Sequence, residues 1–133
     1  MKKLKISTEL ASAALGKEVT KCSLINKSRN SINITYFEDK EDFNTICREW
    51  NIYEFAFKCK EWMLNQKNKD CFYIADQFSL NIESQMGVIK YFWCVLLKNS
   101  SRFSPEFKAD SDLECILKAC EFILTKRNQN ENK

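Results

Sequence analysis

The apolar positions of this 133-residue chain change their spacing along its length. In residues 51–66 they recur at helical spacing, with polar side chains on the opposite side. In residues 32–37 apolar and polar residues alternate, which is typical of a strand with one buried face. Because both spacings occur in one chain, we expect an α+β fold.

The first part of the sequence predicts a short helix followed by three strands. Ser7 supplies a capping hydroxyl where the helix would begin, and Gly16 is the kind of residue that commonly ends one. Two β-rich segments, 19–25 and 32–37, flank a polar turn and predict a hairpin. A third strand with a weaker pattern is expected over residues 43–50.

Two longer amphipathic helices are also expected. The first spans residues 51–66, where Asn51 and Glu54 have the spacing of a capping box. The last helix begins at Ser111, and Glu114 gives it the same signature. The predicted buried stripes are Ile52, Phe55, Ala56, Cys59, Trp62 and Met63 in the first, and Leu113, Ile116, Leu117, Cys120, Ile123 and Leu124 in the last.

Strand signals return between these helices. They cover residues 71–75, 78–82 and 88–97, and an extended piece over 103–107 is interrupted by Pro105. We therefore expect one antiparallel sheet of five or six strands. The two long helices would cover one face of this sheet, and the short N-terminal helix would lie elsewhere.

The length of 133 residues suits a single domain over residues 1–133. Residues 58–64 and 118–124 resemble each other, which points to an internal duplication of a β-then-helix unit over about 18–66 and 71–127. Alternatively, any two amphipathic helices with capping boxes look alike, so both interpretations stay open.

Missing residue types exclude several kinds of catalyst. The chain has no histidine, which excludes Ser-His-Asp and Cys-His nucleophiles and zinc sites that need imidazole. Its two glycines, Gly16 and Gly87, cannot form a phosphate-binding loop or a dinucleotide fingerprint. We expect no catalytic residues and no cofactor. An enzyme would need carboxylates, a thiolate or a lysine, and no spacing nominates one.

The seven cysteines contain no Cys-x-x-Cys pair, so we expect no metal site. The residues after Met1 lack the apolar core of an export signal, and the apolar run Tyr91–Leu97 is too short to cross a membrane as a helix. We therefore expect a cytoplasmic protein, without a membrane partner, whose thiols stay reduced and pack as small apolar groups.

Charged residues favour no particular ligand. The net charge is +3, and the acidic residues of 38–42 lack the spacing and the glycine of a calcium loop, so we expect a solvated loop. Nucleic-acid binding stays an alternative, because basic side chains lie near Trp62 and Tyr73 in the sequence. These basic residues are Lys58, Lys60, Lys67 and Lys69.

The strand 88–97 carries apolar residues on both faces. If the helices cover one face, Tyr91 and Trp93 are left on the other as an exposed aromatic patch. Arg102 and Phe103 would lie beside them on the neighbouring strand as a rim. Alternatively, the short first helix or a curled sheet covers this second face, as in ordinary central strands.

Two segments carry a family resemblance. Residues 107–114 followed by Lys118-Ala119-Cys120-Glu121 resemble the C-terminal motif of small phage-encoded proteins of the phage ABA-sandwich type. The stretch from Ser7 to Gly16 that leads into Val19 is similar to prophage proteins. The resemblance implies a phage or mobile-element origin, and it carries no catalytic residues.

Together these features lead us to expect a non-catalytic protein-binding module, and specifically a phage-derived, anti-CRISPR-like inhibitor of a bacterial defence system. Its partner would be a bacterial protein or protein complex in the host-cell cytoplasm, and a homodimer is a further expectation. A nucleic-acid-binding phage regulator is the alternative function. A small enzyme using carboxylate or thiolate chemistry is the second alternative.

Overall fold

The computed structural model describes most of the chain and shows an α+β protein. It contains three helices and seven strands within the described residues, and none of these helices is long and apolar enough to span a membrane. The chain divides into two compact units, residues 1–59 and 60–133. The described residues are 6–26, 31–66, 77–98, 101–102 and 104–131.

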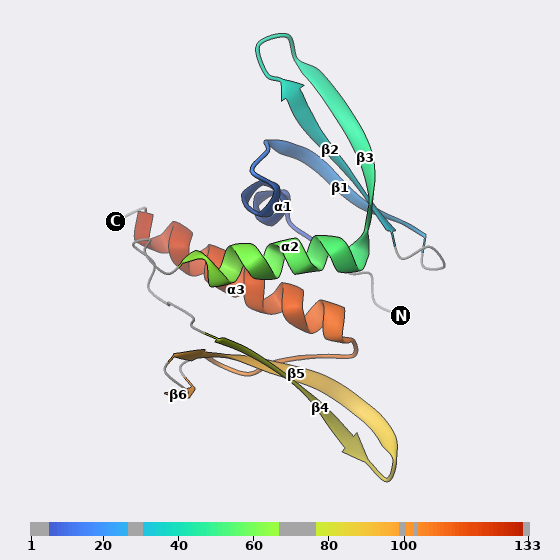
Figure 1. Ribbon diagram of the computed structural model, residues 1–133, viewed down its shortest axis with the longest axis vertical. Coiled ribbons are helices and arrows are strands. Elements are labelled where there is room, and N and C mark those ends of the chain that lie inside the picture. Colours follow the sequence, from blue (N-terminus) through green and yellow to red (C-terminus); the bar gives the residue numbers. More distant parts are fainter. Residues whose placement is uncertain (1–5, 27–30, 67–76, 99–100, 103, 132–133) are drawn as a thin grey trace. The chain divides into compact units, whose positions relative to one another are not determined.

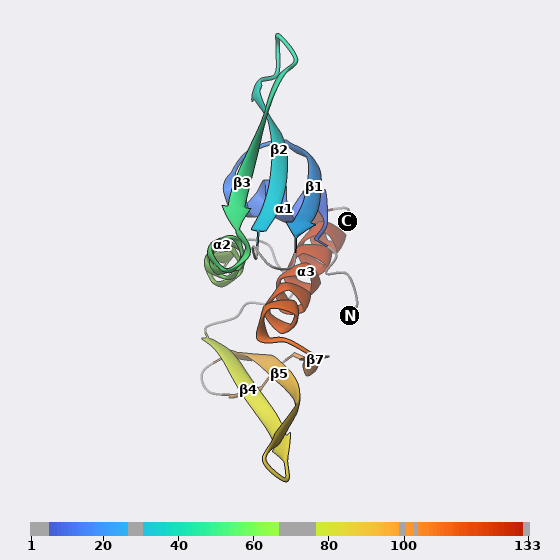
Figure 2. The same ribbon diagram turned by 90° about the vertical axis from the view of Figure 1, so that its right-hand side faces the viewer.

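The first unit contains a three-stranded antiparallel sheet (Figures 1 and 2). Its strands are β1 (Val19–Asn26), β2 (Ser31–Asp39) and β3 (Asn44–Asn51), with β2 in the centre. Apolar side chains alternate along β2, and Ile32 and Ile34 are buried. The predicted hairpin and third strand are thereby confirmed.

The helix α1 (Thr8–Leu15) precedes this sheet and packs on β1. The Ser7 hydroxyl accepts a hydrogen bond from the Leu10 backbone N–H at 3.0 Å. Gly16 ends the helix with a φ of 65°, in the left-handed region that a residue without Cβ adopts most easily. Both predicted ends of this helix are confirmed.

The helix α2 (Ile52–Leu64) follows β3 without a loop and contains the point where the first unit ends. The Asn51 side-chain oxygen accepts hydrogen bonds from the N–H groups of Tyr53 and Glu54, at 2.9 and 3.3 Å. This confirms Asn51 as the cap. Five members of the predicted stripe are buried: Ile52, Phe55, Ala56, Cys59 and Met63.

The second unit contains a four-stranded antiparallel sheet followed by a helix. The strands are β4 (Gln77–Gln85), β5 (Val88–Lys98), β6 (Ser101–Arg102) and β7 (Phe107–Ala109), and β5 pairs with the other three. The helix α3 (Asp112–Glu131) contacts β5 and β7.

Contacts between α3 and the sheet form the core of this unit. The Cys94 thiol donates a hydrogen bond to the Cys115 carbonyl at 3.4 Å, and both residues are fully buried. The ring centroids of Phe107 and Phe122 lie 5.3 Å apart. Ser111 caps the helix as predicted, because its hydroxyl accepts a hydrogen bond from the Glu114 N–H.

The expectation of one sheet with five or six strands is wrong, because the strands form two separate sheets. Consequently no common sheet exists for both long helices to cover. Alternating apolar residues predict that a segment is a strand, but each described strand pairs within its own hairpin or with a near neighbour in sequence. The strand expected at 71–75 lies outside the described residues.

Candidate functional site: an apolar hairpin

A two-residue turn closes the hairpin of β4 and β5. Gln85 pairs with Val88, so Met86 and Gly87 form the turn between them. Their φ angles of 53° and 77° are both left-handed, as in a type I′ turn. The first turn position favours asparagine or glycine, and a bulky side chain there costs about 1–2 kcal/mol. Met86 therefore stands at the tip against its local backbone preference.

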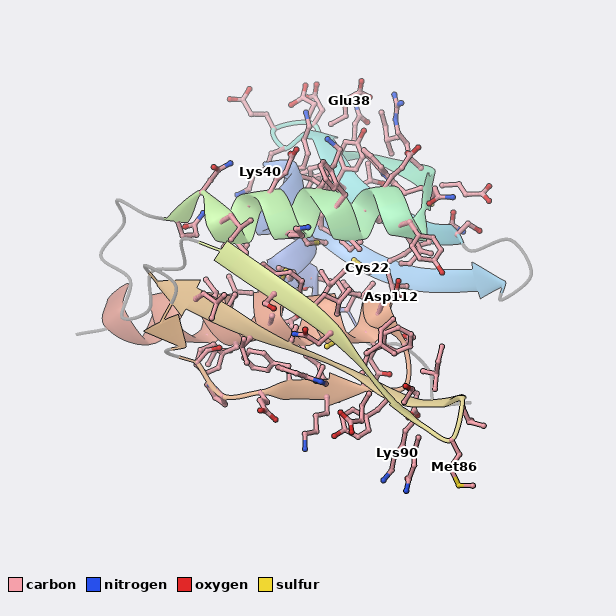
Figure 3. The ribbon with its side chains drawn as sticks, turned by 60° about the horizontal axis from the view of Figure 1, so that its bottom comes forward. Cys22, Glu38, Lys40, Met86, Lys90 and Asp112 are labelled. Carbon is pink, nitrogen blue, oxygen red and sulfur yellow. The ribbon has the colours of Figure 1, made fainter. Side chains whose placement is uncertain are left out.

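The hairpin also carries an unusual amount of exposed apolar surface. Met86 is 96% exposed, and its side chain extends outward beyond the turn at the tip of the hairpin (Figure 3). Val88 and Ile89, the next two residues after the turn, are 69% and 57% exposed. We define the hairpin patch as Leu80, Ile82, Met86, Val88 and Ile89, all of which are exposed.

Leu80 and Ile82 of the hairpin patch continue the buried face of the sheet beyond the part that α3 covers. Leu80 pairs with Cys94, and Ile82 pairs with Phe92, so these residues share the face on which α3 packs. Cys94 is fully buried, whereas Ile82 is 56% exposed. The apolar pattern of the strands therefore extends past the helix that buries it.

The opposite face of β5 carries the two predicted aromatic residues. Tyr91 and Trp93 are both half-buried and lie two residues apart, so they share this face. Lys108 of β7 pairs with Trp93, and its Nζ atom lies 5.3 Å from the centroid of the Tyr91 ring. On the β4 side, Asn81 pairs with Trp93 and Glu83 pairs with Tyr91. Polar residues therefore flank the aromatic pair on both sides.

Less is described of Arg102 and Phe103, the other two predicted binding residues. Arg102 pairs with Leu97, at the far end of β5 from Tyr91, and its side chain is not described. Phe103 lies outside the described residues. The neighbour of Trp93 on β7 is Lys108, which is not among the four predicted residues. A shared surface of all four predicted residues stays a prediction.

Sequence reasoning missed the tip of the hairpin. Gly87 lies between the two predicted strands, and a glycine between β-rich segments is the usual signal of a tight turn. Methionine is not a typical turn residue, and Val88 favours a strand. The residues on either side of Gly87 therefore do not indicate a turn in the sequence.

The first unit also contains an exposed apolar residue with a positive φ, as Met86 has in the second unit. Phe43 lies between β2 and β3, is 79% exposed and has a φ of 57°. In the part of the chain that the structure describes, Phe43 and Met86 are the two residues other than glycine with positive φ. They are also the two most exposed large apolar residues there.

The acidic residues next to Phe43 form an exposed turn. The Asp39 side chain accepts hydrogen bonds from the N–H groups of Glu41 and Asp42, at 3.0 and 3.4 Å. Lys40 pairs with Glu18 at 3.0 Å. The carboxylate of Asp39 is therefore occupied in shaping the turn.

The described thiols lie mostly in the interior. Cys59, Cys94, Cys115 and Cys120 are buried, whereas Cys47 is exposed. A hydrogen bond with Cys115 and burial raise the pKa of the Cys94 thiol, which keeps it protonated and a poor nucleophile. Within the described ranges, no group of three Cys, Asp or Glu side chains is arranged to hold a metal ion.

Two of the basic residues considered for nucleic acid lie against aromatic rings. The Nζ atom of Lys58 is 5.8 Å from the ring centroid of Trp50, and that of Lys60 is 5.4 Å from the ring centroid of Phe78. Lys67, Lys69 and Tyr73 lie outside the described residues. The described lysines of this group are thus each within reach of a ring of the protein itself.

Comparisons with known proteins give no relative for this chain. No family model, curated protein or solved structure matches it. The function must therefore be argued from the residues of the hairpin and their surroundings.

Proposed function

We propose that this protein is a non-catalytic protein-binding module and that the hairpin patch is its contact surface. The observation that carries the proposal is Met86, which is 96% exposed on a backbone with a φ of 53°. A bulky apolar side chain in this position gains nothing for folding, because it is both unburied and strained. Such a side chain becomes favourable when a partner covers it.

The hairpin is well suited to enter an apolar pocket. A type I′ turn fixes the direction of the tip, so little conformational freedom is lost on binding. Methionine is flexible and polarisable, and it adapts to pockets of irregular shape. Full burial of one such side chain contributes about 1.5–3 kcal/mol. Val88 and Ile89 would add apolar contact on either side of the strand.

A protein pocket fits this surface better than a nucleic acid does. Glu83 and Lys90 are the two charged residues of the hairpin's tip half, and their charges cancel. Nucleic-acid sites instead gather several basic side chains along one groove. Binding of the nucleic-acid type would weaken steeply as salt rises, whereas apolar docking would not.

The partner class comes from the resemblance to phage proteins rather than from the hairpin. A phage-encoded binding module of this size fits the role of an inhibitor of a bacterial defence system, such as an anti-CRISPR protein. The partner we propose is accordingly a bacterial protein or complex of that kind.

The test compares the protein with its Met86→Asn variant in pull-downs from bacterial lysate, read out by mass spectrometry. Asparagine suits the left-handed turn position, so the hairpin keeps its shape while the apolar tip is lost. We expect a defence component that the original chain captures and the variant does not. Equal capture by both chains would contradict the role of Met86, and the absence of any captured defence protein would contradict the partner class.

Val88→Thr and Tyr53→Ser are the companion variants. Threonine keeps the branched side chain that strands favour and removes apolar contact at the patch, so capture should weaken. Tyr53 is 53% exposed on α2 and is not part of the hairpin patch. Tyr53→Ser should leave capture unchanged, and if it also abolishes capture, the loss is not specific to the hairpin.

A further inference from the structure

The outer edge of β4 has the character of a strand that pairs with another strand. In the described part of the chain, β4 pairs with β5 alone, and Figure 2 shows β5 between β4 and β7. An edge strand presents unpaired N–H and C=O groups along its length. Natural sheets protect such edges with lysine, proline or a very short strand. The nine residues of β4 include no lysine and no proline.

The sequence of β4 is complementary to itself when two copies run antiparallel. The strand Gln77–Gln85 has Asn81 at its centre. With Asn81 opposite Asn81 of a second copy, Leu80 faces Ile82 and Ile82 faces Leu80. These two side chains are 39% and 56% exposed in the single chain, so each would cover the other.

The polar face of β4 agrees with the same register. Glu83 is the single charged residue of the strand, and it would lie opposite Ser79 rather than opposite another carboxylate. The Asn81 side chain now donates to the Ser79 hydroxyl at 3.0 Å, and paired asparagines can exchange hydrogen bonds across the two-fold axis. No like charges meet in this register.

Shifting the pairing by one residue removes this agreement. Leu80 would then lie opposite Asn81, and every apolar residue of β4 would face a polar one. A shift by two residues, with Leu80 opposite Leu80, keeps the faces but shortens the overlap. It also places Phe78 opposite Ile82, and Phe78 is half-buried and already lies under the ammonium group of Lys60. The register centred on Asn81 uses the whole strand.

We propose that a second copy of this chain pairs antiparallel with the outer edge of β4, centred on Asn81, and that the two sheets become one continuous sheet in the dimer. The residues of the hairpin patch then have two different roles. Leu80 and Ile82 serve the pairing of copies, while the tip residues Met86, Val88 and Ile89 remain outside the strand pair. A dimer of this kind displays two tips.

The first experiment measures molar mass by sedimentation equilibrium over a range of protein concentrations. The original chain should show a reversible dimer. In Asn81→Lys, two ammonium groups meet at the two-fold axis, and the dissociation constant of the dimer should rise roughly fivefold or more. Val88→Lys adds the same charge on β5, away from the outer edge of β4, and should leave the dissociation constant unchanged.

The second experiment tests the register with a symmetric disulfide. In a Cys47→Ser background, which removes the exposed thiol among the residues that the structure describes, Asn81→Cys places two thiols opposite each other. Opposite residues of antiparallel strands have Cα distances that suit a disulfide. Oxidised glutathione accepts the two electrons and is reduced as the two thiols lose their protons and join. We expect a covalent dimer from Asn81→Cys and none from the matched Val88→Cys.

Three results would overturn the pairing. One is a monomeric original chain at all concentrations. The second is equal dissociation of Asn81→Lys and Val88→Lys, which would mean that added charge alone separates the copies. The third is a dimer in which Asn81→Cys does not cross-link under conditions where its thiol reacts with a maleimide probe.

Discussion

Lys108 lies opposite Trp93 in the pairing of β7 with β5, and its side chain reaches along the sheet to the ring of Tyr91. The distance from Nζ to the ring centroid is 5.3 Å, which is within the range of a cation–π contact. Lys108 therefore covers part of the aromatic face from which a partner was expected to bind. Tyr91 and Trp93 are half-buried for this reason and because of their polar neighbours on β4.

Trp93→Ala tests whether this aromatic face belongs to the binding surface. Because Trp93 is half-buried, the substitution should lower the free energy of unfolding by about 1–2 kcal/mol, less than the 3–5 kcal/mol typical of a fully buried aromatic residue. Loss of partner capture would extend the contact surface from the hairpin patch to this aromatic face, and unchanged capture would exclude Trp93 from it. Urea titration and pull-down measure the two effects, and a collapsed fold would show that Trp93 is ordinary core.

Met86→Asn should make the isolated protein more stable. Asparagine adopts the left-handed conformation of the first turn position more easily than methionine, and Met86 buries almost nothing that would be lost. We expect the free energy of unfolding to rise by about 0.5–1 kcal/mol in urea titration.

The control for this variant is Gln85→Asn, which places an asparagine one residue earlier, at the last position of β4. It lies outside the two turn positions and should not stabilise the protein. A decrease in stability for Met86→Asn would show that the methionine side chain packs on the protein and is not held for a partner.

The local elements of this fold could be predicted because their signals are local. The caps at Ser7, Asn51 and Ser111 each depend on one side chain reaching an N–H two or three residues away, and all three are present. The buried stripe of α2 depends on helical spacing alone. Such features need no knowledge of the tertiary arrangement.

The division into two sheets could not be predicted in the same way. The alternation of Ile32 and Ile34 identifies a strand and its buried face, but it does not specify the partner strand. The exposed tip of the hairpin could not be predicted for a related reason. Whether Ile82 and Ile89 are buried depends on how far α3 extends over the sheet, which no single segment of sequence records.

Ser111→Ala should destabilise the second unit by about 1 kcal/mol. The Ser111 hydroxyl accepts a hydrogen bond from the Glu114 N–H at 3.2 Å, and this N–H has no partner within the helix. Ser111→Asp keeps an acceptor and places a negative charge at the helix start, so it should retain most of the stability. Thermal unfolding compares the variants, and equal losses for Ala and Asp would contradict the capping role.

The buried Cys94 thiol should make the protein less stable at alkaline pH. The hydrogen bond with Cys115 and burial raise the pKa of Cys94 above the ordinary 9.0, so the folded chain keeps a proton that the unfolded chain loses. The stability that Cys94 contributes is then complete below pH 9 and is lost as the pH rises above it, and the lowered pKa of Cys115, its partner in this hydrogen bond, offsets part of the loss. Urea titrations at pH 8 and pH 10, under reducing conditions, should show this loss in the original chain. Cys94→Ala should start from a lower stability but lose less of it between the two pH values, because the thiol with the raised pKa is gone. Equal losses in both chains would show that other groups cause the alkaline effect.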